Sequence, residues 1–206
     1  MKKSIVIASL AMLSLAACKK NMVSLPGNLA AKMPVTSKDT NSFVKYTIAQ
    51  GGQYCDNNWY ETVKYRQLSF KVKFDSSAIY QTRLASNQTD INKLYGFSDN
   101  NALHHVYSAR FGWRWSNHAL RLFGYIYNHS AMSEKELGTV EIGAENNCSI
   151  KVNNDTYVFT LNGKETTMPR ESTTSLAEGY KLYPYFGGDE VAPHTISIYI
   201  EELQQQ

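Results

Sequence analysis

The sequence predicts an all-β protein, an antiparallel β-sandwich, because short alternations of apolar and polar residues recur along most of the chain. Turn residues separate these alternations at intervals of roughly 8–12 residues, as is typical of sandwich domains. The clearest pair spans residues 106–127 and alternates on both sides of Asn117-His118, as two strands and a tight turn would. Because no long amphipathic pattern interrupts the series, we expect few or no helices outside the N-terminal leader.

Residues 1–17 are expected to be a lipoprotein signal peptide. Lys2 and Lys3 precede an apolar run that ends at Ala17, shorter than the roughly 20 residues of a membrane-spanning helix. The run ends in Leu-Ala-Ala-Cys, which resembles the bacterial lipobox, where the signal is cut before the cysteine and the thiol is lipidated. The resemblance implies lipidation of Cys18 and export to the cell envelope, on the periplasmic side or at the cell surface. An ordinary signal peptide followed by a coincidental cysteine is the alternative.

Residues 18–42 are expected to carry the lipid and to form a flexible tether, because they mix Lys, Asn, Ser, Thr and Pro with small apolar residues. Residues 43–203 are then a single β-sandwich domain, long enough to bury a substantial core. The formal charge of the whole chain is +3, and removing residues 1–17 with their two lysines leaves a nearly neutral protein. Such a chain lacks the clustered basic patch of nucleic-acid-binding proteins, so we expect no nucleic-acid partner.

Two further cysteines, Cys55 and Cys148, lie in polar surroundings. In an oxidising compartment such an even pair predicts a disulfide. The bridge would close a long loop and contribute up to ~4–5 kcal/mol in the chain-entropy model. Two buried free thiols are the alternative. A zinc site is not expected, because the sequence contains no CxxC motif and no paired His-Cys spacing.

In chain order, the first strand is expected from Phe43 to Ile48, followed by a turn at residues 50–53 and a second strand or irregular segment at 59–65. Residues 68–74 alternate cleanly, and 78–82 are a candidate continuation of that strand. Residues 92–99 lead into a loop that contains His104-His105. The stretch from 128 to 147 has weak periodicity, and a helical turn is a candidate at Ser133 to Glu136. The remaining expected strands are 149–152, 156–161, 164–168, 180–186 (interrupted by Pro184) and 196–200.

A two-residue turn at Asn117-His118 fixes the faces of the central hairpin, because side chains alternate along each strand. The apolar face, expected in the core, contains the pairs Trp115–Leu120, Trp113–Leu122, Phe111–Gly124 and Ala109–Ile126. The opposite face contains the pairs Arg114–Arg121, Gly112–Phe123, Arg110–Tyr125 and Ser108–Tyr127. Two opposed arginines repel by roughly 0.2–1 kcal/mol, so a nearby acid or an anionic ligand is expected. The structural alternative is that arginine stems simply cover aromatic rings.

Three stretches, Tyr157–Lys164, Tyr183–His194 and Ile196–Ile200, resemble secreted bacterial proteins with a concanavalin A-like jelly roll. The resemblance implies a sandwich whose ligands lie across the concave sheet. Lectin-like domains, glycoside hydrolases and polysaccharide lyases share that fold, so the fold does not choose between them. The candidate ligand-binding residues on the polar hairpin face are Arg110, Arg114, Arg121, Tyr125 and Tyr127.

The enzyme motifs of that superfamily are incomplete in this chain. The laminarinase-like Glu-x-Asp-x-Glu strand has no equivalent, since Glu141 and Glu145 lack an intervening Asp. On a strand they would also stand farther apart than the ~5–5.5 Å of a retaining pair. The alginate-lyase-like Arg-x-Glu-x-Arg strand has both arginines, Arg110 and Arg114, but Gly112 replaces the acid, and no Gln-x-His occurs.

These patterns favour a lipoprotein that binds a glycan or polysaccharide and is attached to the membrane through its N-terminal lipid. A structural or protein-binding envelope lipoprotein is a second hypothesis, and a polysaccharide lyase or glycoside hydrolase is a third. No catalytic residue is assigned; the candidate acid/base groups are His104, His105, Tyr125, Tyr127 and Glu141. No cofactor or metal is expected, and the loop acids that would serve if Ca²⁺ bound are Asp99, Asp189 and Glu190.

Overall fold

The structure, a computed structural model, describes residues 42–204. The expected signal peptide, the expected lipidation site Cys18 and the expected tether up to residue 41 lie outside the described residues. Within residues 42–204, no helix has the length and apolar character needed to cross a membrane.

The regular secondary structure of the described chain is almost all β, as the sequence predicts, and its helical elements are two short 3₁₀ turns, η1 (Ser76–Ala78) and η2 (Ala85–Thr89). The strands are β1 (Val44–Ile48), β2 (Thr62–Tyr65), β3 (Gln67–Phe74), β4 (Asn92–Ser98), β5 (Ser108–Ser116), β6 (Ala119–Asn128), β7 (Ala131–Val140), β8 (Asn146–Asn153), β9 (Thr156–Leu161), β10 (Lys164–Pro169), β11 (Ala177–Leu182) and β12 (Ile196–Glu202).

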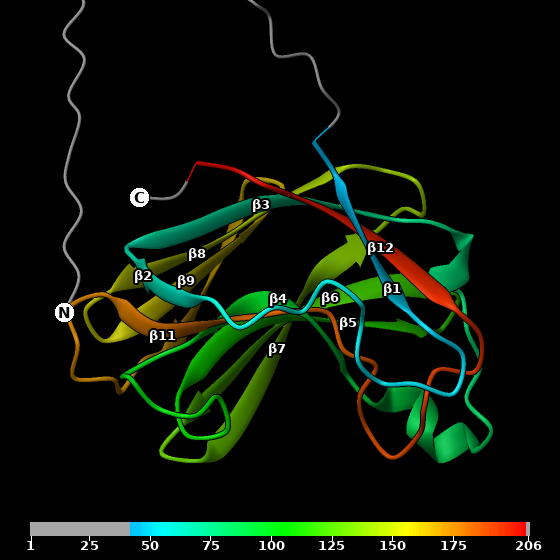
Figure 1. The fold of residues 1–206 in the computed structure, drawn as a ribbon, viewed down its shortest axis with the longest axis horizontal. Helices are drawn as coiled ribbons and strands as arrows, with labels where there is room; N and C mark the ends of the chain where they lie inside the picture. Colours follow the sequence, from blue (N-terminus) through cyan, green and yellow to red (C-terminus); the bar gives the residue numbers. More distant parts are fainter. Residues whose placement is uncertain (1–41, 205–206) are drawn as a thin grey trace, which may run out of the picture. The chain divides into compact units, whose positions relative to one another are not determined.

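Two six-stranded antiparallel sheets form the sandwich (Figure 1). The first has the strand order β1-β12-β3-β8-β9-β10, and the second has the order β2-β11-β4-β5-β6-β7. Apolar side chains from both sheets meet in one core, where for example Phe70 of β3 packs edge-on against Phe111 of β5 at 5.4 Å between ring centroids. The antiparallel β-sandwich expected from the sequence is therefore confirmed.

The central hairpin has the pairing that the sequence predicts. Strands β5 and β6 pair from Ser116 with Ala119 outward to Ser108 with Tyr127. Asn117 and His118 both have positive φ, 51° and 58°, as a type I′ turn requires. The apolar face lies in the core, and the polar face points away from it on the outer side of the second sheet.

Strand β7 occupies the region where a helical turn was a candidate, so that prediction is wrong. Ala131–Val140 pairs with β6 along its whole length, with a register irregularity opposite Leu122 and Phe123. The strand lies at the edge of the sheet, and its first six residues are exposed on both faces. An edge strand exposed on both faces needs no apolar alternation, and charges such as those of Glu134 and Lys135 protect it from pairing with other chains. The sequence therefore lacked the period-two signal.

Two other expected strands end earlier than predicted. Residues 78–82 do not continue β3, because the η1 turn follows it and the chain then leaves the sheet. Strand β11 ends at Leu182, before Pro184, which has no N–H for the ladder. Beyond the proline, Tyr185 returns to the sheet as a single bridge to Lys93.

The prediction of a disulfide between Cys55 and Cys148 is wrong. Both side chains are buried free thiols. Cys55 bridges Ile48 at the outer side of β1, whereas Cys148 lies on β8, beyond β12 and β3. Four strand spacings of ~4.8 Å separate the two cysteines by roughly 19 Å across the sheet alone, well beyond the ~7 Å limit for bridging.

Two of the three loop acids considered for Ca²⁺, Asp99 and Glu190, hold other parts of the protein through their carboxylates. Asp99 is fully buried and accepts hydrogen bonds from Arg170 Nε at 2.8 Å and from Tyr157 Oη at 2.6 Å. Glu190 accepts bonds from the backbone N–H groups of Arg83 and Leu84. Among residues 42–204, no group of three or more His, Cys, Asp and Glu side chains is placed to hold a metal ion.

Candidate functional site

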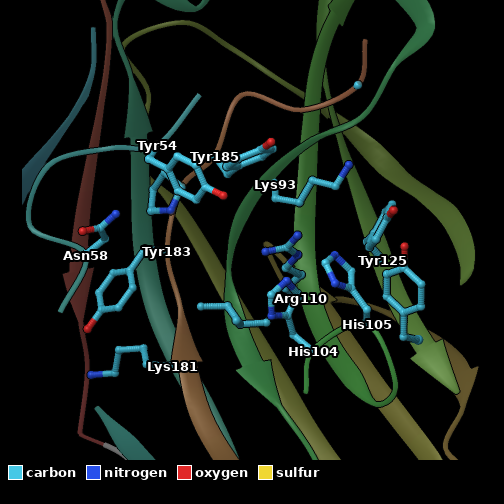
Figure 2. Close-up of a pocket in the computed structure, with 14 residues that line it drawn as sticks. Tyr54, Asn58, Lys93, His104, His105, Arg110, Tyr125, Lys181, Tyr183 and Tyr185 are labelled. Atoms are coloured by element: carbon cyan, nitrogen blue, oxygen red, sulfur yellow. The ribbon is translucent and has the colours of Figure 1, made fainter. Parts of the chain in front are cut away.

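A cavity of about 430 Å³ opens on the outer face of the second sheet, over β11, β4, β5 and β6. Figure 2 shows Arg110 near its centre, between Lys93 and the two histidines. The residues that line the cavity are Tyr54, Asn58, Lys93, His104, His105, Arg110, Tyr125, Tyr127, Lys181, Leu182, Tyr183, Pro184, Tyr185 and Gly188.

The floor of the pocket comes from neighbouring strands. Arg110 of β5 lies opposite Tyr125 of β6 on one side and Gly96 of β4 on the other. A Cβ at position 96 would lie 2.2 Å from Arg110 Cβ and 2.3 Å from the carbonyl oxygen of Ala109. Only glycine at position 96 therefore lets β5 approach β4 closely enough to hold Arg110 in this position.

The walls come from loops that the same strands hold in place. Lys93 and Tyr185 exchange both backbone hydrogen bonds, at 2.8 and 2.9 Å, which anchors the segment after β11 at the pocket. The Tyr54 ring, from the β1–β2 loop, packs edge-on against the Tyr185 ring at 4.9 Å. Figure 2 shows these two rings together at one end of the pocket. The β4–β5 loop supplies His104 and His105 at the other end.

Arg110 is a buried cation without an acidic partner. Only 8% of its surface is exposed. Within the described residues, no carboxylate lies in ion-pairing distance of its guanidinium, and Cζ lies 5.9 Å from the centroid of the Tyr125 ring. Burial lowers the pKa of Arg110 to about 10, so the group keeps its charge at neutral pH.

Lys93 adds a second cation beside the first. Its Nζ donates a hydrogen bond to the carbonyl oxygen of Ile91 at 2.6 Å and lies 4.7 Å from the Tyr125 ring centroid. Burial, and then the neighbouring charge of Arg110, lowers the pKa of Lys93 from 10.5 to about 8. Both cations are therefore held in the pocket against a desolvation penalty.

Lys181 lines the same pocket but is already neutralised. Its Nζ lies 2.8 Å from carboxylate oxygens of both Glu61 and Glu202. Burial lowers its pKa, but the hydrogen bonds to Glu202 and Glu61 outweigh burial and raise the pKa above the usual value. Arg110 and Lys93 are thus the lining cations without an ion pair, and none of the lining residues is an Asp or a Glu; Asp90 and Glu134 act on Lys93 from outside the lining.

His104 is held in a defined neutral form. Its backbone N–H donates to the Tyr180 hydroxyl oxygen at 3.0 Å, so the Tyr180 proton is free to be donated to Nδ1, 2.8 Å away. A neutral imidazole has one N–H donor and one acceptor nitrogen, so the ring can both donate and accept a hydrogen bond. Burial, with further contributions from His105 and Arg110, lowers the pKa of His104 to about 4. At neutral pH the imidazole is therefore uncharged.

The structure brings only part of the predicted ligand-binding set together. Arg110, Tyr125 and Tyr127 line the pocket, whereas Arg114 and Arg121 do not. Arg114 donates to the carbonyl oxygen of Thr89 at 2.6 Å and lies over the Phe123 ring. Arg121 forms an ion pair with Glu136 of β7 at 2.8 Å. The acid expected near the two opposed arginines is thus Glu136, contributed by a strand that the sequence did not reveal.

Among the candidate acid/base groups, His104 and His105 line the pocket together with the two tyrosines, and Glu141 does not. Sequence reasoning missed Lys93, because a lysine in an alternating strand has the pattern of a solvent-facing residue. It also missed the wall formed by Tyr54, Tyr183 and Tyr185. The aromatic run at 180–186 was visible as a strand, but no local pattern shows which strands are neighbours.

No family model matches this chain, and no curated protein is similar to it. Solved structures do match. The alginate lyase AlyC3 superposes with a TM-score of 0.54 at 10% identity, over 80% of this chain and 74% of that one. A GH16 protein of the Bacteroides ovatus mixed linkage glucan PUL gives 0.52 at 12% identity, over 81% and 83%. The laminarinase catalytic domain of Thermotoga maritima gives 0.52 at 11%, over 78% and 76%. At these identities the likeness shows the fold, a concanavalin A-like jelly roll.

Proposed function

We propose that this protein is an exported, lipid-anchored envelope protein that binds an acidic polysaccharide in the pocket centred on Arg110. The observation that carries the proposal is the pair of cations, Arg110 and Lys93, held in a desolvated pocket that no acid lines. A buried charge without a partner is unfavourable for folding, and a bound carboxylate or sulfate would offset that penalty. A guanidinium also matches a planar carboxylate with two parallel hydrogen bonds.

The remaining groups of the pocket suit a sugar. Five tyrosines line it, at positions 54, 125, 127, 183 and 185. Their rings offer apolar faces for the C–H groups of a pyranose, and their hydroxyls offer hydrogen bonds at the edges. His104 adds a neutral N–H donor. The solved structures that share the fold include an alginate lyase and two glucan-related proteins, which supports a glycan as the ligand class.

The pKa shifts favour binding over cleavage. A general acid or base acts best when its pKa lies near the working pH. Burial, and then the hydrogen bond with Tyr127, raises the pKa of Tyr125 well above its usual value, while burial lowers that of His104 to about 4. Both groups are thus shifted away from neutrality, in opposite directions, and each stays in its neutral form.

The full-length protein in detergent should bind alginate and polygalacturonate in a calorimetric titration and should not bind the neutral glucans laminarin and mixed-linkage β-glucan. Equal binding of the neutral glucans, or no binding of any of the four, would overturn the proposal. The same mixtures can be followed by ultraviolet absorbance of unsaturated uronates. A steady rise would replace the binding role with that of a polysaccharide lyase.

The affinity for an acidic glycan should fall as the pH rises from 7 to 9. Lys93, with a pKa of about 8 in the free protein, is mostly charged at pH 7 and mostly neutral at pH 9. Since a bound anion raises that pKa, up to tenfold in affinity is lost for each pH unit above 8. Calorimetry at several pH values measures this. Lys93→Met should bind more weakly at pH 7 and show a flat profile, whereas a flat wild-type profile would contradict the assignment of Lys93 to the site.

Lipidation is expected at Cys18, on the strength of the Leu15-Ala16-Ala17-Cys18 sequence. In a bacterial host fed a clickable fatty-acid analogue, the wild-type protein should carry the label and the Cys18→Ala variant should carry none. Cys55→Ala is the matched control and should stay labelled, because Cys55 is buried. Label that persists in Cys18→Ala would show that the acyl chain is attached elsewhere, and a wild-type protein without label would show that the resemblance to the lipobox is accidental.

A further inference from the structure

Exposed apolar residues are concentrated on the two loops beside the pocket, and the capture of one acidic group does not explain them. The most exposed large apolar side chains in the described residues keep between 69% and 78% of their surface accessible, and they are Tyr54, Trp59, Tyr60 and Leu103. All four belong to the two loops that border the pocket, residues 49–61 and 99–107. Exposed apolar groups gathered in one place mark an interaction surface.

Trp59 and Tyr60 are held at the rim of the pocket. Asn58, immediately before them, lines the pocket. Glu61, immediately after them, accepts a hydrogen bond through its carbonyl oxygen from the backbone N–H of Lys181 at 2.9 Å. Because Asn58 lines the pocket and the Glu61 backbone is bonded to β11, the two aromatic residues between them lie where the rim of the pocket approaches β11.

The Tyr60 ring is supported from below. It packs on the Tyr180 ring, with 5.6 Å between centroids, and the Tyr180 hydroxyl is in turn hydrogen-bonded to His104 of the pocket. Tyr60 nevertheless leaves 78% of its surface to solvent. A ring that is positioned by one neighbour and open on its remaining surface is preorganised for a ligand, since little conformational freedom is lost on binding.

The size of the pocket leaves room for only part of a chain-like ligand. Its volume of about 430 Å³ lies toward the lower end of the range of roughly 300–1,000 Å³ seen for pockets that hold drug-sized molecules. A polysaccharide that places one acidic sugar over Arg110 must therefore extend over the rim. The aromatic rim residues offer the apolar faces on which a pyranose ring packs.

We infer that Trp59 and Tyr60 form a stacking platform, so that the site binds a stretch of several sugars rather than a single sugar or a chain end. This inference rests on the proposed function, because the platform extends the same pocket. The pocket and the platform then have different roles. Arg110 and Lys93 select the acidic group, and the platform selects longer chains through apolar contacts rather than charge.

The tryptophans allow a direct test. The chain has three, of which Trp113 is fully buried and Trp115 is partly buried against the core, so Trp59 is the exposed one. Oligomers of mannuronate and of galacturonate, two and six sugars long, are titrated into the full-length protein in detergent. Affinity is measured by calorimetry, and exposure of Trp59 is measured by acrylamide quenching of its fluorescence.

The hexamer should bind at least about tenfold more tightly than the dimer and should protect Trp59 from acrylamide, while the dimer should not. Trp59→Ala should reduce hexamer affinity to that of the dimer and leave dimer affinity unchanged. The control Val44→Ala removes an exposed apolar side chain from β1 of the other sheet and should change neither affinity. Equal affinity for both lengths, or a Trp59→Ala variant that binds the hexamer normally, would overturn the platform.

Failure of the platform and failure of the proposed function give different results. If both lengths bind equally well and Arg110→Met abolishes both, the acidic pocket stands and the platform does not. If no oligomer binds at any length, the acidic pocket itself is rejected, and the platform with it.

Discussion

Arg110→Met should lower the affinity for an acidic glycan by about 30-fold or more and, at the same time, raise the stability of the protein. The loss of affinity follows because removing one member of a buried, hydrogen-bonded charge pair costs roughly 2–5 kcal/mol, and 1.4 kcal/mol is tenfold. The gain in stability follows because methionine keeps the apolar stem and removes a charge that is only 8% exposed and has no acidic partner among the described residues. Replacing buried charges by apolar groups stabilises proteins by about 1 kcal/mol or more.

The two effects are measured separately, by calorimetric titration and by thermal unfolding without ligand. A gain of about 1 kcal/mol raises the Tm of a domain of this size by roughly 2–4 °C. Arg114→Met is the matched control, because Arg114 lies on the same strand and face but bonds to Thr89 instead of lining the pocket. It should leave affinity unchanged and slightly lower the Tm. The reverse pattern, with affinity lost in Arg114→Met and kept in Arg110→Met, would move the binding site along the hairpin.

Asp99→Asn should destabilise the protein by roughly 3–5 kcal/mol, the usual effect of breaking a fully buried ion pair from one side. The Asp99 and Arg170 side chains are 0% and 1% exposed, and Arg170 Nε lies 2.8 Å from the carboxylate. The carboxylate also accepts bonds from the Tyr157 hydroxyl and from the backbone N–H of Glu178. An asparagine side chain keeps the shape but leaves the Arg170 charge buried without a counter-charge.

Urea unfolding measures this change, and the ligand-binding residues are not involved. Lys64→Met is the control, because the Lys64–Glu178 pair has 66% of the lysine side chain exposed and such surface pairs contribute little, about 0–1 kcal/mol. A loss of less than about 1 kcal/mol in Asp99→Asn would mean that neighbouring dipoles alone can hold Arg170. It would also remove the explanation for how the loop after β10 is fastened to the end of β4.

Local pattern was sufficient for the fold class and for the central hairpin. The faces of β5 and β6 depend only on alternation and on the turn at Asn117-His118, and both are written in consecutive residues. The sequence did not predict strand β7, because an edge strand exposed on both faces has no apolar alternation to detect. Its pairing with β6 is determined by the ladder of backbone hydrogen bonds.

The site was only partly predictable, for a related reason. That Arg110 and Arg114 share a face is a local fact, but which of them meets a partner depends on Thr89, Glu136 and other residues brought in by tertiary contacts. Lys93 lies beside Arg110 only because β4 pairs with β5. Tyr185, which follows Pro184, is brought to the pocket by its backbone bridge to Lys93. The disulfide prediction failed in the same way, since strand order decides how far apart two cysteines lie.

The separation of the two thiols has a practical consequence for the chemistry of the chain. A thiol reacts with oxidants and disulfides as its thiolate, and burial, followed by Asp56, raises the pKa of Cys55 to about 12. Burial raises the pKa of Cys148 as well. Burial and a raised pKa both lower the reactivity of these sulfurs toward oxidants and disulfides in the folded protein. Because Cys55 and Cys148 are not bridged, the sandwich should refold in dithiothreitol without loss of yield.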